Sequence, residues 1–124
     1  MLTLPRFEWA SPATVDEALA LMDGARGDVL VVAGGTDAVP NLKHRLHEPR
    51  RVVSLGRIGT LRHIEEDDSG THLGALVTLT ELTRHAGVRR DFTGLAKAAS
   101  MVAGPQLRNM GTIGGNLCLD TRCT

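Results

Sequence analysis

Two glycine-rich stretches and a pair of cysteines carry the clearest chemical potential in this sequence. The first stretch, "VVAGGTDA", covers residues 31–38, and the second, "GTIGGN", covers residues 111–116 and is followed by Cys118 and Cys123. Glycines let backbone amides approach an anion, and a helix that begins just after them adds free N–H groups and a positive dipole end. Together the two stretches predict a grip on the two phosphates of a dinucleotide. Either stretch alone is also typical of an ordinary turn.

Side chains near the glycines add to this chemistry. Thr36 contributes a hydroxyl to the first loop, which matches neither the G-x-G-x-x-G nor the Walker A pattern. Asn116 tolerates unusual backbone dihedrals and offers both a donor and an acceptor. Arg108 lies just before the second loop, where it is expected to neutralise a phosphate or to face a redox partner.

Other reactive side chains form weaker patterns. Two cysteines without a C-x2-C core cannot hold a 4Fe–4S cluster, which needs four thiolates. His44 and His47 have the spacing of a metal-binding pair, but no third ligand is in register, so a solvated surface is the preferred interpretation. The serines and threonines near histidines show no nucleophile signature, which argues against a hydrolase.

The composition excludes several classes of protein. The chain has 124 residues, 42% of them hydrophobic, with 14 basic and 14 acidic residues and no net charge. This balance argues against a general nucleic-acid or anionic-membrane surface. No apolar run approaches the roughly 18 residues of a membrane span, and no secretory signal pattern opens the chain, so a cytoplasmic protein with reduced cysteines is expected. Because the sequence stops inside the cysteine motif, it is expected to be an N-terminal piece of a longer polypeptide.

Residues 1–56 predict a first subdomain of β-α-β-α-β order. "FEWASP" and "RRVVSL" are typical of strands, and "DVLVVAGG" of a buried strand that ends in glycines. A helix over about 14–23 begins with a capping box formed by Thr14 and Glu17. A second helix begins at a cap provided by Thr36 or Asp37, has a proline in its first turn, and reaches its limit at Pro49.

Residues 57–124 predict the N-terminal part of a second subdomain. "TLRHIEED" and "THLGAL" flank the turn "DSG" and predict an antiparallel hairpin. Thr78 and Glu81 form a second capping box, and a longer helix follows in "RDFTGLAKAASMVAG", capped by Asp91 or Thr93. The glycine-rich stretch after it is predicted to be a loop. The fold class is therefore α/β (α+β), with two small α/β subdomains, the second incomplete.

Three motifs in this order resemble one known family. "VVAGGTDAVPNLK", "LGALVTLTEL" and "AGPQLRNMGTIGGNLC" are together similar to the FAD-binding subunit of the molybdenum hydroxylases, which include xanthine dehydrogenase, carbon monoxide dehydrogenase and 4-hydroxybenzoyl-CoA reductase. The resemblance extends along the whole chain, and "RNMGTIGGN" after "VAGP" is its most specific part. It implies two α/β subdomains with FAD between them and glycine loops that hold the FAD pyrophosphate.

The resemblance also implies which residues contact FAD, motif by motif. In the first loop these are Val32, Ala33, Gly34, Gly35, Thr36, Asp37 and Ala38. The flavin side would be lined by Val102 and Ala103. In the second loop they are Gly111, Thr112, Gly114, Gly115 and Asn116.

The last residues depart from the usual family pattern. Most members continue with Ser-Pro and then an Asp near the flavin, whereas here Asp120 is the candidate at a shorter spacing. "NLCLDTRCT" is similar to the β-subunit of 4-hydroxybenzoyl-CoA reductase, which implies an inserted 4Fe–4S cluster with Cys123 as its first ligand. The other three ligands would come from residues after Thr124. Cys118 is expected to be buried near the flavin loop and not to be a ligand.

The function implied by the resemblance is electron transfer by a flavoprotein oxidoreductase subunit. Partner subunits would carry 2Fe–2S clusters and a molybdopterin centre. In the reductase interpretation, electrons run from a ferredoxin-like donor through the extra cluster to FAD and then to molybdenum. Two alternatives stay open: an FAD subunit of a xanthine or carbon monoxide dehydrogenase type of hydroxylase, and an inactive truncated fragment that does not hold flavin.

Overall fold

The protein is described here by a computed structural model that covers residues 3–24 and 27–119. The chain divides into two compact units, Met1–Thr60 and Leu61–Thr124, and each unit is described by itself. Both units contain helices and strands, as predicted. In the part of the chain that the structure covers, no helix has the length and apolar character that crossing a membrane would require.

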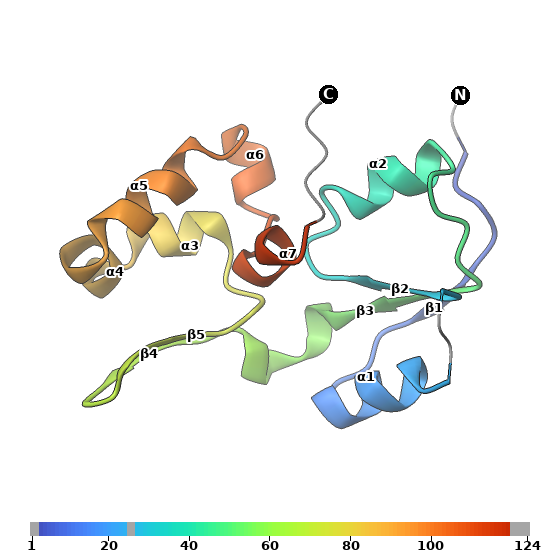
Figure 1. Ribbon diagram of the computed structural model, residues 1–124, viewed down its shortest axis with the longest axis horizontal. Helices are drawn as coiled ribbons and strands as arrows, with labels where there is room; N and C mark the ends of the chain where they lie inside the picture. The colour runs from blue at the N-terminus through green and yellow to red at the C-terminus, as the bar shows by residue number, and fades with distance from the viewer. Residues whose placement is uncertain (1–2, 25–26, 120–124) are drawn as a thin grey trace. The chain divides into compact units, whose positions relative to one another are not determined.

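The first unit is a three-stranded parallel sheet with a helix on each face. Its strands are β1 (Glu8–Ala10), β2 (Val29–Val32) and β3 (Arg51–Ser54), in the spatial order β1-β3-β2. The connecting helices α1 (Val15–Met22) and α2 (Ala38–Lys43) lie on opposite faces of the sheet (Figure 1). The predicted β-α-β-α-β order is confirmed.

The central strand β3 carries the core of this unit. Val52 and Val53 are both fully buried, although successive strand residues point to opposite faces. Val52 packs with Val32 of β2 and Leu42 of α2, and Phe7 and other half-buried side chains close the cluster. Because both faces of a short parallel sheet must be covered, the apolar run in β3 requires both helices.

An ion pair fixes the register of the outer strand β1. Glu8 lies opposite Arg51, and its Oε2 accepts hydrogen bonds from Nε and Nη2 of Arg51 at 3.0 and 2.9 Å. The third nitrogen, Nη1, donates to the carbonyl of Leu21 at 3.3 Å. One half-buried arginine therefore joins β1, β3 and the end of α1.

Helix α2 is shorter than the sequence predicts. It was expected to continue to Pro49, but it ends at Lys43, because Arg45 adopts a left-handed conformation with φ of 54°. The amide of Arg45 donates to Leu42 and that of Leu46 donates to Asn41, which is the hydrogen-bond pattern of a Schellman motif. Glycine is the usual residue at the left-handed position of this motif, so the sequence analysis did not predict a helix end at an arginine.

The second unit begins with a hairpin and continues as short helices. The strands β4 (Ile64–Asp67) and β5 (Gly70–Leu73) pair antiparallel around the predicted "DSG" turn. The helices are α3 (Leu79–Arg84), α4 (Ala86–Asp91), α5 (Thr93–Met101), α6 (Pro105–Arg108) and α7 (Ile113–Leu117). The hairpin and the capping box of Thr78 and Glu81 are confirmed.

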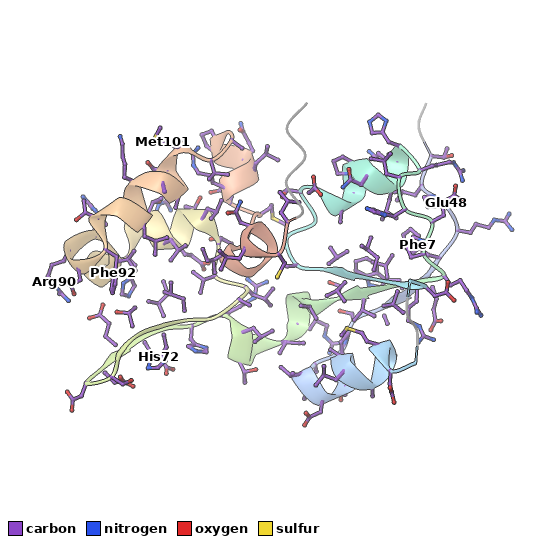
Figure 2. All side chains as sticks on the ribbon, in the orientation of Figure 1. Phe7, Glu48, His72, Arg90, Phe92 and Met101 are labelled. Atoms are coloured by element: carbon purple, nitrogen blue, oxygen red, sulfur yellow. The ribbon has the colours of Figure 1, made fainter. Side chains whose placement is uncertain are left out.

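The helix boundaries in this unit differ from the prediction. His85 is both the last cap of α3 and the first cap of α4. Its Nδ1 accepts a hydrogen bond from the amide of Val88, so α4 follows α3 without a loop between them. Phe92, and not Asp91 or Thr93, occupies the cap position of α5. Arg90 of α4 reaches Glu66 of β4, with Nη2 and Oε2 3.3 Å apart, which ties the helix to the hairpin (Figure 2).

The core of the second unit lies among α3, α4 and α5. Its buried members are Val77, Leu79, Leu82, Val88 and Ala99. Half-buried side chains from the hairpin, from the first half of α5, from the residue after α5 and from the start of α7 pack against them; these are Ile64, Leu73, Leu95, Ala96, Val102 and Ile113. These apolar contacts connect the hairpin to the second glycine stretch.

Gly74 permits a close approach at the end of β5. Its amide donates to the carbonyl of His63 at 2.8 Å, and the amide of Leu76 donates to that of Leu61 at 2.8 Å. A methyl group at Gly74 would overlap the Leu61 carbonyl oxygen and lie 2.9 Å from the backbone nitrogen of His63. Because both neighbours are backbone atoms, neither can move without disturbing the pairing.

We predict that Gly74→Ala destabilises the protein by about 1–3 kcal/mol, the usual cost of overpacking a well-packed site. Gly94→Ala is the matched control, because a methyl group there meets open space within α5. The control is expected to be neutral or slightly stabilising, since alanine favours helix more than glycine does. Urea denaturation of the full-length gene product measures both, and equal stability of the two variants would contradict the packing argument.

Candidate functional site

The first glycine loop connects β2 to α2. Val32 ends the strand buried in the core, and Ala33 and Gly34 bend away from it. Gly35 has φ of 74°, in the left-handed region that favours glycine. A methyl group there would make only ordinary contacts, 3.5 Å from a Val32 methyl group and 3.6 Å from one of Val39. The backbone conformation, and not lack of space, therefore requires the glycine.

The backbone of this loop leaves donors available to a ligand. Within the described part of the chain, the amides of residues 34–38 have no hydrogen-bond acceptor, whereas the amide of Val39 already donates to the Gly35 carbonyl at 3.0 Å. Asp37 stands at the cap position of α2, but its side chain makes no capping bond. Its Oδ2 accepts from the Asn41 side chain at 2.7 Å instead. A run of unpaired N–H groups at a helix start can bind an anion.

The second glycine stretch is more ordered than the sequence predicts. It was expected to be a loop, but Thr112 caps the short helix α7, and its Oγ1 accepts from the amide of Gly115 at 3.1 Å. The amide of Ile113 donates to Val77 at 2.8 Å, and that of Gly114 donates to Ala75 at 2.9 Å. Three successive amides are therefore used within the protein.

Packing explains the glycine at position 114. A methyl group there would lie 2.7 Å from the Ala75 carbonyl oxygen and 2.8 Å from the Ala75 Cβ. The exposed part of this stretch consists of Gly115 and Asn116, while Thr112 is buried and Gly111 is half-buried. A ligand would therefore meet the end of the motif, above all the Asn116 side chain.

A tight turn joins α5 to α6 and contains the two residues expected on the flavin side. Val102 is half-buried against the core, whereas Ala103 is exposed and has φ of 44°. Arg108 was expected to meet a phosphate or a redox partner. Its Nη1 instead donates to the carbonyls of Val102 and Ala103, at 2.9 and 2.6 Å. Sequence reasoning missed this contact, because a positive φ at alanine leaves no compositional signal.

Comparison with known proteins places this chain in a family. Residues 5–123 match the model of the family described as "FAD binding domain in molybdopterin dehydrogenase". The chain belongs to this family. The predicted FAD-subunit family and the predicted α/β fold class are thereby confirmed.

Individual members of the molybdopterin dehydrogenase FAD-domain family are similar over most of this chain. The nicotinate dehydrogenase FAD-subunit of Eubacterium barkeri is 40% identical over 113 residues, which are 90% of this chain and 38% of that protein. The carbon monoxide dehydrogenase medium chain of Hydrogenophaga pseudoflava is 38% identical over 91% of this chain and 39% of that protein. This chain therefore spans about two fifths of the length of the relatives it matches.

A solved structure supports the same fold. Carbon monoxide dehydrogenase from Hydrogenophaga pseudoflava, in a form that lacks the Mo-pyranopterin moiety of its cofactor, superimposes with a TM-score of 0.89 at 37% identity. The match covers 93% of this chain and 40% of that chain.

The cysteine expectations have different outcomes in this FAD-domain chain. Cys118 was expected to be buried, but it is exposed, because it follows the last residue of α7, a helix with no buried residue. Cys123 and Asp120 lie outside the described residues. Among the described residues, no group of three or more His, Cys, Asp and Glu side chains is placed to hold a metal ion. His44 and His47 are both exposed, as their solvated interpretation predicts.

A Ser-His-Asp cluster occurs in the hairpin, but its geometry is not that of a hydrolase. Ser69 Oγ and Asp67 Oδ2 both lie 3.1 Å from the same His72 nitrogen, Nε2. Ser69 Oγ also donates to Asp67 Oδ1 at 2.6 Å. A catalytic triad needs the acid and the serine on different ring nitrogens, so that histidine can take the serine proton. The cluster is an exposed turn network, with His72 on β5 (Figure 2).

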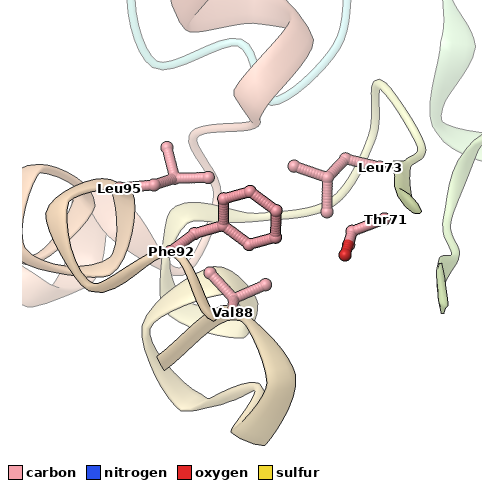
Figure 3. Close-up of a pocket in the computed structure, with 5 residues that line it drawn as sticks. All are labelled: Thr71, Leu73, Val88, Phe92 and Leu95. Carbon is pink, nitrogen blue, oxygen red and sulfur yellow. The ribbon is translucent and has the colours of Figure 1, made fainter. Parts of the chain in front are cut away.

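A small apolar pocket in the second unit is also unsuited to a cofactor. It has a volume of about 80 Å³ and is lined by Thr71, Leu73, Val88, Phe92 and Leu95. Figure 3 shows the Phe92 ring lying among these side chains. Ligand pockets usually measure about 300–1,000 Å³ and present convergent polar groups. This pocket is a packing gap between the hairpin and α4 and α5.

The turn network makes a pH-dependent prediction. Hydrogen bonds from the Ser69 side chain and backbone lower the pKa of Asp67 from 3.8 to about 2, with a smaller contribution from His72. Because the folded pKa is depressed, the stabilisation is fully present above pH 3.8 and is lost as pH falls through about 2. Carboxyl NMR titration is expected to give a midpoint near the lower value, and Ser69→Ala should raise it. A wild-type midpoint at the ordinary value would contradict this network.

Proposed function

We propose that this chain is the FAD-binding part of a flavin subunit in a molybdenum-containing hydroxylase, and that it transfers electrons between FAD and partner subunits. The observation that carries the proposal is the family match over residues 5–123, combined with the unpaired amides of the first glycine loop. The relatives supply the complex type, since they are named as subunits of nicotinate and carbon monoxide dehydrogenases.

The two loops suit different parts of the cofactor. The unpaired amides of residues 34–38 fit the pyrophosphate, which needs several donors at once. The hydroxyl of Thr36 and the backbone of Val32 and Ala33 border the same loop. The second stretch offers fewer free amides, so we assign Asn116 and the exposed Gly115 to direct contact. Gly111, Thr112 and Gly114 then act as the scaffold that places them.

The bound flavin would supply the electron-transfer chemistry, and the protein would supply binding and orientation. The exposed backbone of Ala103 and its half-buried neighbour Val102 are assigned to the flavin side of the site. We also assign to the complex a 2Fe–2S subunit and a molybdopterin subunit. In this arrangement none of the residues described here would meet the substrate, so substrate specificity would belong to the molybdenum subunit.

The hydroxylase type is favoured over the 4-hydroxybenzoyl-CoA reductase type. The reductase interpretation depends on the cysteine motif and on an extra 4Fe–4S cluster, with Cys123 as a ligand. The relatives named above are dehydrogenases that share 38–40% identity with this chain, and they support the alternative instead. Asp120 keeps its proposed place near the flavin in either type.

We predict that Gly35→Ala weakens FAD binding at least tenfold, because a Cβ disfavours the positive φ that holds the donor amides in place. Gly24→Ala is a closely matched control. Its φ is 68°, and a methyl group there meets open space, so it carries similar strain outside the loop. Titration of the FAD-free full-length gene product, followed by visible absorption, measures both affinities. Equal losses in the two variants would contradict a phosphate role for this loop.

The iron content of the isolated flavin subunit distinguishes the two enzyme types. We expect flavin absorption bands with no iron or acid-labile sulfide. About four irons for each FAD would instead support the reductase type, since a 4Fe–4S cluster needs four thiolates. In that case Cys123→Ser should remove the iron. Absence of flavin from a folded full-length protein would overturn the proposed function itself and leave the inactive-fragment alternative.

A further inference from the structure

We infer that Arg108 is a positioning residue that holds the Val102–Gly104 turn in the shape required at the flavin side of the site. This inference rests on the proposed function, because the turn is assigned to FAD there. It concerns a side chain that was expected to meet a phosphate, and it gives that side chain a different role.

The turn adopts a conformation that its sequence alone does not favour. Helix α5 ends at Met101, Val102 is extended with ψ of 122°, and Ala103 then has φ of 44°. A residue with a Cβ meets a steric penalty in this left-handed region, where glycine and asparagine are the usual occupants. Such a conformation persists only when its surroundings determine it.

Arg108 supplies the contacts that hold Ala103 in this conformation. Its Nη1 donates to the Val102 carbonyl at 2.9 Å and to the Ala103 carbonyl at 2.6 Å. The donor nitrogen belongs to a charged guanidinium, which makes these bonds stronger than bonds from a neutral donor. The two carbonyls that accept these bonds lie just after the end of α5. Because one nitrogen binds the carbonyls of two successive residues, it restricts the φ and ψ angles of Ala103.

Helix α6, which contains Arg108, also supports the second glycine stretch. Arg108 is the last residue of α6, and the carbonyl of its neighbour Leu107 accepts from the amide of Gly111 at 2.6 Å. Asn109 accepts from the Thr80 hydroxyl at 2.7 Å, which ties the end of α6 to α3. Arg108 therefore links the flavin-side turn to the helix that leads into "GTIGGN". On the other side, Val102 anchors the turn in the core.

A rescue experiment in the full-length gene product tests the inference. Arg108→Met keeps the aliphatic stem and removes both hydrogen bonds, and it is expected to weaken FAD binding about tenfold, equivalent to roughly 1.4 kcal/mol. Adding Ala103→Gly should restore most of the affinity, because glycine adopts positive φ without a clamp. Arg108→Met with Ala98→Gly is the control, since Ala98 is an exposed alanine of α5, the helix before the turn, and should give no rescue.

A second readout separates this inference from the proposed function. Scalar couplings of selectively labelled Ala103 in the FAD-free protein report its φ, which is expected to be positive in the wild type and to leave that region in Arg108→Met. If the wild type binds no FAD, the proposed function fails, and the clamp is judged by these couplings. Unchanged couplings, or equal rescue by both glycine variants, would overturn the clamp. Should Arg108→Met not fold, Arg108→Gln carries the same comparison, because its side chain is uncharged and shorter than that of arginine.

Discussion

The close pairing of residues 75–79 with residues 111–114 is the constraint on which the second unit depends. Three backbone bonds make it: Leu79 donates to Gly111, Ile113 donates to Val77, and Gly114 donates to Ala75. The two segments approach so closely that a side chain at position 114 would meet Ala75. This pairing brings residues 111–114 against the segment between the hairpin and α3. It places α7 against the core through Ile113 and fixes where Asn116 is presented.

The two glycine motifs look alike in sequence, but their glycines are required for different structural reasons. In the first, glycine provides a positive φ, and the following amides have no partner among the described residues. In the second, glycine leaves room for a close backbone contact, and the amides donate to the carbonyls of Val77 and Ala75 and to the Thr112 hydroxyl. A glycine count cannot distinguish these cases, because conformational freedom and lack of volume come from the same missing Cβ. Only the partners of each amide do so.

The sequence predicted the features that depend on local chemistry. The capping residues Thr14 and Thr78, the "DSG" hairpin and the strand before Gly34 follow from short-range patterns, and all of them occur in the structure. That strand was expected to be buried, but only its last residue, Val32, is buried, and Val31 is exposed. The features it missed depend on backbone dihedrals that ordinary residues adopt under tertiary constraint. Arg45 ends α2 early, and Ala103 closes α5, each with a positive φ and a side chain that usually avoids one. The exposure of Cys118 has a different cause, because its backbone dihedrals are ordinary and it follows α7, a helix with no buried residue.

Charged side chains play a small part in the proposed site, although its proposed ligand carries a pyrophosphate. The run from Val31 to Leu42 contains no lysine or arginine, and it contains one acid, Asp37, whose carboxylate accepts from Asn41. Arg108, the cation nearest the second stretch in sequence, is engaged by backbone carbonyls. A pyrophosphate bound here would therefore be met mainly by oriented amides and a helix start, as in other glycine-loop anion sites. Recognition of that kind depends on backbone shape, so we expect the glycine at position 35 and the clamped turn at position 103 to affect FAD binding more than surface charge does.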